Sequence, residues 1–90
     1  MNNEASKARA MLITMMKTYG TKSPKETGLK LVAMRNEVKQ VLESGRSLEG
    51  DAITSSQRKD LKKQLIHYRD EMQSLKNHNK IYQEAKSKAE

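Results

Sequence analysis

Five basic side chains recur on one side of the segment that follows residue 57, and their type and spacing suit the binding of anions. A helix advances by about 100° per residue, so the five fall within about 40° of one another and span roughly 33 Å. This basic stripe consists of Arg58, Lys62, Arg69, Lys76 and Lys80. Such a row suits a phosphate backbone, with steeply salt-dependent binding. The alternative, which we favour, is a solvated face whose long stems cover the edge of an apolar seam.

The rest of the sequence limits what kind of nucleic-acid binding the stripe predicts. No aromatic residue lies on it for base stacking, and Gln73 is its only obvious reader of base edges. Any such binding is therefore expected to be sequence-independent. The formal net charge is +7, from 18 Lys and Arg against 11 Asp and Glu. An excess of basic residues favours an acidic binding partner, which can be nucleic acid, an acidic protein face or an anionic membrane, and the charge alone does not choose among them.

The sequence gives no sign of catalysis or of a bound cofactor. It has no cysteine, and its two histidines, His67 and His78, are separated by about 16 Å along a helix, which is too far for one metal ion. No serine lies in a nucleophile elbow, and no glycine-rich loop follows a strand. The carboxylates resemble helix caps and surface pairs. We predict a non-enzyme with no cofactor, no metal site and no small-molecule substrate.

An apolar seam next to the stripe predicts a long amphipathic helix over residues 55–88. Its members alternate in steps of four and three, which is the pattern of a coiled coil. The seam consists of Leu61, Leu65, Tyr68, Met72, Leu75, Asn79 and Tyr82. Asn79 has two interpretations. It fixes the register of a parallel dimer by pairing with its symmetry mate, or the seam has ended and Asn79 is solvated.

Two shorter helices are predicted before the seam, over residues 3–19 and 24–44. Ser23 and Glu26 form a capping box at the start of the second, and glycines follow the end of each. The second helix is apolar on two sides, with Leu29, Val32 and Ala33 opposite its main face, so we expect it in the middle of the fold. The methionines of the first helix are interpreted as core, with a peptide-binding groove as the alternative.

Residues 45–53 are predicted to form the main loop, with Leu48 and Ile53 as apolar anchors, and residues 54–57 to form a second capping box. Residues 1–90 then make a single all-α domain. In this domain a short helical hairpin packs on the first half of a long third helix, which continues as a coiled coil. The half beginning at Met72 is expected to overhang the bundle, leaving its seam open to a second copy or a partner helix.

The chain contains no segment that predicts insertion into a membrane. Its longest apolar run, residues 10–16, is much shorter than the ~20 residues that a membrane-spanning helix needs. A helix lying on the membrane surface over residues 3–19 is a minor alternative, since aromatic interface residues are missing. We expect a cytoplasmic protein that does not act at a membrane.

The leading functional prediction is a small adaptor or inhibitor that binds a protein partner, as a homodimer paired through its C-terminal coiled coil. The first alternative is a sequence-independent nucleic-acid-binding protein that uses the basic stripe. The second is a structural or assembly protein of a larger particle. In size, charge and lack of Phe and Trp the chain resembles the small regulators of phages and plasmids in type, without sharing a motif with them.

Overall fold

The fold is all-α, and a computed structural model describes residues 3–89 of the chain. Its helices are α1 (Asn3–Tyr19), α2 (Pro24–Ser44) and α3 (Ser55–Ala89). The predicted fold class is confirmed, because two short helices pack on a long C-terminal helix. Within the described range the only β-type pairing is an isolated antiparallel bridge between Arg46 and Ala52, which closes the loop between α2 and α3.

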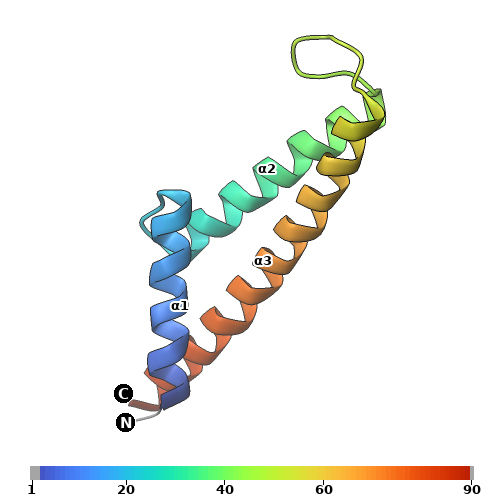
Figure 1. The fold of residues 1–90 in the computed structure, drawn as a ribbon. Helices are drawn as coiled ribbons and strands as arrows, with labels where there is room; N and C mark the ends of the chain where they lie inside the picture. Colours follow the sequence, from blue (N-terminus) through green and yellow to red (C-terminus); the bar gives the residue numbers. More distant parts are fainter. Residues whose placement is uncertain (1–2, 90) are drawn as a thin grey trace.

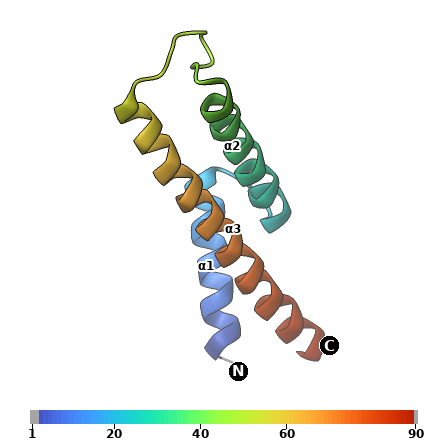
Figure 2. The ribbon, with the colours of Figure 1, turned by 90° about the vertical axis from the view of Figure 1, so that its right-hand side faces the viewer.

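The two short helices follow one another along α3 instead of lying side by side. Figures 1 and 2 show α2 running antiparallel to the first half of α3, and α1 running antiparallel to its second half. The result is a rod of 54 × 19 × 18 Å with a radius of gyration of 16.5 Å. A compact domain of this length would have a radius of about 12 Å.

This arrangement corrects two expectations. The second half of α3 does not overhang, because α1 covers it. The helix that contacts both of the others extensively is α3 and not α2, which touches α1 only where the two meet.

The bend between α1 and α2 is set by local backbone chemistry. Gly20 has a φ of 65°, which only glycine adopts without steric cost, and it ends α1. Ser23 then caps α2: its Oγ accepts a hydrogen bond from the Glu26 amide at 3.1 Å. The Glu26 carboxylate accepts from the amide of Lys22 at 2.8 Å. The predicted capping box is therefore present, with its return bond shifted by one residue.

The start of α3 shows the second predicted capping box in its reciprocal form. The Thr54 amide donates to Gln57 Oε1 at 2.9 Å, and the Gln57 amide donates to Thr54 Oγ1 at 3.0 Å. Within the loop that precedes it, Ile53 is half-buried, but Leu48 is 72% exposed. The expectation that Leu48 anchors the loop is therefore wrong.

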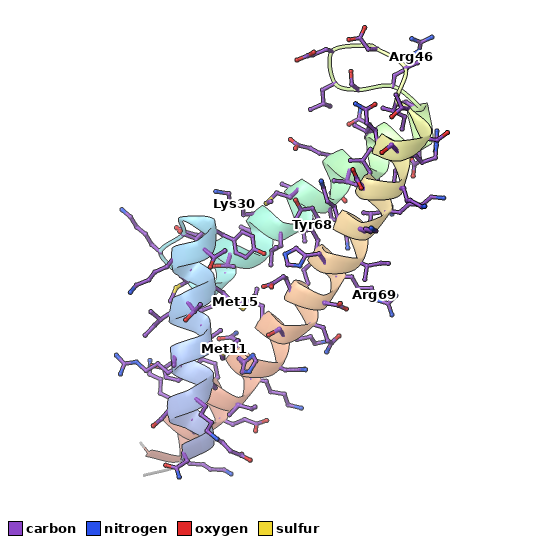
Figure 3. All side chains as sticks on the ribbon, in the orientation of Figure 1. Met11, Met15, Lys30, Arg46, Tyr68 and Arg69 are labelled. Carbon is purple, nitrogen blue, oxygen red and sulfur yellow. The ribbon has the colours of Figure 1, made fainter. Side chains whose placement is uncertain are left out.

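The core lies where the three helices meet. Leu12 and Met15 of α1, Leu31 of α2 and Leu75 of α3 form one buried cluster. Four partly buried side chains pack around it: Tyr19, Tyr68, Met72 and Tyr82. The core interpretation of the methionines holds for Met15, which Figure 3 labels on α1, whereas Met11 is 41% exposed.

Candidate binding surface on α2 and α3

The apolar seam of α3 is used inside the chain. Leu75 is buried, and the other six members of the seam are half-buried. Tyr68, Met72 and Tyr82 pack on the core cluster that α1 and α2 complete. A coiled coil formed by the same residues with a second copy would require the short helices to leave α3.

The second half of α3 also contacts its neighbour through residues outside the seam. Ser74, His78, Ile81 and Ala85 are half-buried at helical spacing on the part of α3 that α1 covers. Sequence reasoning missed this second face because it holds two polar residues and only one large apolar one. The four-three-four spacing was the signal that could have revealed it.

One residue of the basic stripe caps a helix, and the other four are exposed. Arg58 is half-buried, and its Nη1 donates to the carbonyl oxygen of Leu42 at 3.2 Å, so it caps the end of α2. Lys62, Arg69, Lys76 and Lys80 are exposed. In Figure 3, Arg69 lies on the side of α3 that faces away from α1. Among the described residues, no carboxylate pairs with these four side chains.

A groove runs between the start of α2 and the middle of α3, directly beside the stripe. We call it the central groove, and its volume is about 490 Å³. Its apolar side chains are Leu29, Val32, Met72 and Leu75, its basic ones are Lys25 and Lys76, and Asn79 lies at its end. Leu29 is 63% exposed, and Val32 and Ala33 are exposed too, so the expected packing of α2 on two sides is wrong.

The interpretation of Asn79 as a solvated residue beyond the end of the seam is wrong for its side-chain oxygen. Its side-chain oxygen is buried, and no described residue donates a hydrogen bond to it. A buried acceptor without a donor is costly, by about 1–3 kcal/mol. Asn79 therefore lines the central groove but keeps a buried, unpaired acceptor behind it. Pairing with a symmetry mate stays a prediction.

A second groove lies at the far end of the rod, between the loop and the helices that it connects. Its apolar lining comes from Val41, Leu48, Ile53 and Leu61. Glu49 and Asp60 also line it. The two grooves therefore differ in charge: the central one carries lysines and the distal one carries carboxylates.

The histidines lie in different surroundings. His67 is exposed, with its ring centroid 5.8 Å from that of Tyr68. His78 is half-buried, and its Nδ1 lies 2.7 Å from the carbonyl oxygen of Ser74, which favours the tautomer that donates from Nδ1. No cluster of three metal-ligating side chains occurs in the described part of the chain. Within that part, no helix combines the length and apolar character needed to cross a membrane.

Tyr19 is the described residue whose pKa shifts clearly. Burial raises the pKa of its hydroxyl. Electrostatic repulsion of its charged form by Glu71 and by Tyr68 raises the pKa further, and so does a hydrogen bond to the Glu71 side chain. The folded state therefore holds this proton more tightly than the unfolded state. The resulting stability is fully present below the unfolded pKa of about 10 and is lost as the pH rises through the folded pKa.

Removing the Tyr19 hydroxyl should flatten the alkaline end of the stability profile. We expect Tyr19→Phe to lose less stability than the wild type between about pH 9.5 and 11.5, measured by urea unfolding followed by circular dichroism. Tyr82→Phe is the control, since Tyr82 packs on the same core cluster. An unchanged alkaline slope in Tyr19→Phe would contradict this assignment.

No protein-family model, curated protein or solved structure matches this chain.

Proposed function

We propose that this protein is a small, non-enzymatic helical adaptor or inhibitor that acts by binding a protein partner. The supporting observation is the surface where the central groove meets the basic stripe. Leu29 and Val32 leave an apolar patch uncovered, and Lys25 and Lys76 flank it. An apolar centre with a charged rim is the usual composition of a protein-binding surface.

The charge of this surface favours a partner with an acidic face. Lys62, Arg69, Lys76 and Lys80 lie along about 27 Å of α3, and none pairs with a described carboxylate. A partner that presents acidic side chains around one or two large apolar ones would complement both parts. Electrostatic attraction would speed its association, and the apolar contact would slow its release.

Site-specific photo-crosslinking in the cells from which the protein comes tests this proposal. A photoreactive amino acid at Leu29 should give one dominant adduct with another protein. The same group at Ile13, which is 37% exposed on α1, is the control and should not give that adduct. Equal adduct patterns from both positions would contradict the proposal. An adduct with a second copy of this chain would not be evidence of a partner protein.

A second candidate function is sequence-independent binding of nucleic acid. The observation that favours it is the exposure of four stripe cations on one side of a straight helix, at a spacing that suits phosphate contacts. With four such contacts, the slope of log K against log salt would be about −3 to −4 on duplex DNA.

Charge reversal separates this candidate from the adaptor. We expect Lys62→Glu/Arg69→Glu to weaken binding of labelled duplex DNA and single-stranded RNA at least about tenfold, measured by fluorescence anisotropy at low and near-physiological salt. The salt slope should fall by about two units. Lys59→Glu/Lys63→Glu makes the same charge change at exposed α3 positions outside the stripe. Equal losses in both variants would indicate net-charge attraction alone, and no wild-type binding would remove this candidate.

A further inference from the structure

The loop between α2 and α3 presents an apolar side chain with acidic neighbours. Leu48 is 72% exposed, and Glu49 and Asp51 are exposed beside it. The loop is held in shape by its own hydrogen bonds. The Ser47 amide donates to the carbonyl of Asp51 at 2.7 Å, and Arg46 Nη1 donates to that of Gly50 at 2.9 Å. An ordered loop loses less conformational entropy when it binds than a mobile one.

The central groove has the complementary composition. Leu29 and Val32 supply an uncovered apolar surface, and Lys25 and Lys76 supply positive charge at its edge. Its volume of about 490 Å³ is ample for a leucine side chain. The same chain therefore carries both an exposed apolar side chain with acidic neighbours, in the loop, and an apolar surface with lysines at its edge, in the central groove.

The two features cannot meet within one molecule. The loop ends where α3 begins at Ser55, and the groove lies around Leu75. Twenty helical residues separate these positions by about 30 Å. Figure 1 shows the loop at one end of the rod and the bend between α1 and α2 near its middle. A loop that fills a central groove must therefore come from another molecule.

We propose that the loop of one copy docks in the central groove of a second copy. Leu48 contacts Leu29 and Val32, while Glu49 and Asp51 face the lysines of the groove. Each copy carries both halves of the contact, so the contact is reciprocal in a two-fold dimer or repeats along a chain of copies. This self-association needs no partner protein and goes beyond the adaptor function. It would compete with a partner for the same groove.

Reversing the charge on each half in turn tests the contact. The loop variant is Glu49→Lys/Asp51→Lys, and the groove variant is Lys25→Glu/Lys76→Glu. We expect sedimentation velocity over a concentration series to show that the wild type self-associates. Each variant alone should associate at least about tenfold more weakly, because like charges then oppose one another.

Mixing the two variants is the decisive step. In an equimolar mixture the basic loop of one variant meets the acidic groove of the other, and the reverse contact also matches, so association should return. Lys59→Glu/Lys63→Glu is the matched control and should behave as the wild type. Leu48→Ser, which changes one exposed loop side chain, should weaken association without altering the helical circular dichroism spectrum.

Three results would overturn the proposal. The first is a wild-type protein that stays a 10.3 kDa monomer at every concentration up to about 1 mM, a concentration at which even a contact of about −4 kcal/mol is half-formed. The second is association that all the variants retain, which would place the interface elsewhere. The third is a mixture of the two variants that does not regain association. A failed crosslink to a partner would leave this contact unaffected, so the two proposals fail separately.

Discussion

Replacing Leu31 with alanine should lower the free energy of unfolding by about 2–5 kcal/mol. Leu31 has an exposed fraction of 0%, and it joins the core cluster in which α1, α2 and α3 meet. The substitution removes apolar contacts with both other helices and leaves a cavity. A chain of this size has a total stability of the order of 5 kcal/mol, so the change would remove much of it.

Thermal unfolding followed by circular dichroism measures this effect. We expect the midpoint to fall by roughly 10 °C or more, since each kcal/mol shifts a domain of this size by about 4–8 °C. Ile66→Ala is the control, because Ile66 lies on α3 with 60% of its side chain exposed, and it should change stability by less than about 0.5 kcal/mol. Similar losses in both variants would mean that the described core does not hold the helices together.

The second large effect is expected at Thr27, the buried polar residue of the described chain. Thr27 is 0% exposed. Its Oγ1 donates to the carbonyl oxygen of Ser23 at 3.0 Å and also forms a hydrogen bond with the hydroxyl of Thr21. Thr27→Val keeps the shape but leaves the Thr21 hydroxyl without this partner. We expect a loss of about 1–3 kcal/mol in the free energy of unfolding.

A double-mutant cycle shows whether the two threonines act as a pair. Thr21→Val/Thr27→Val removes both hydroxyls, so neither hydroxyl is left without the other, and the Ser23 carbonyl oxygen still accepts from the Thr27 amide at 3.0 Å. The double variant should therefore lose less stability in urea unfolding than the sum of the single variants. Additive losses would show that the contact between the hydroxyls contributes nothing to the bend between α1 and α2.

The ends of the helices could be predicted from the sequence because they depend on neighbouring residues. Ser23 and Thr54 cap the helices that follow them through hydrogen bonds spanning three residues. Gly20 and Gly45 adopt the positive φ values that end the helices before them. The spacing of apolar residues likewise predicted helices over residues 3–19, 24–44 and 55–88, close to the observed bounds of α1, α2 and α3.

Such local patterns could not predict how the helices pack against one another. The seam of α3 indicates an apolar face, but a heptad pattern does not distinguish a partner helix in the same chain from one in a second copy. The expected overhang after Met72 was wrong because, although each short helix alone is shorter than α3, the two cover it in succession. Placed end to end, the two short helices match the length of α3.

The sequence by itself therefore determined the three helices, their caps and the basic stripe, because each depends on residues a few positions apart. Only the tertiary structure decided which of these features remain available for binding. It assigned Arg58 to the cap of α2, covered the seam with α1 and α2, and left Leu29 and Leu48 exposed. The physical reason is that exposure depends on which helix lies across each surface, and this follows from contacts between residues far apart in the chain.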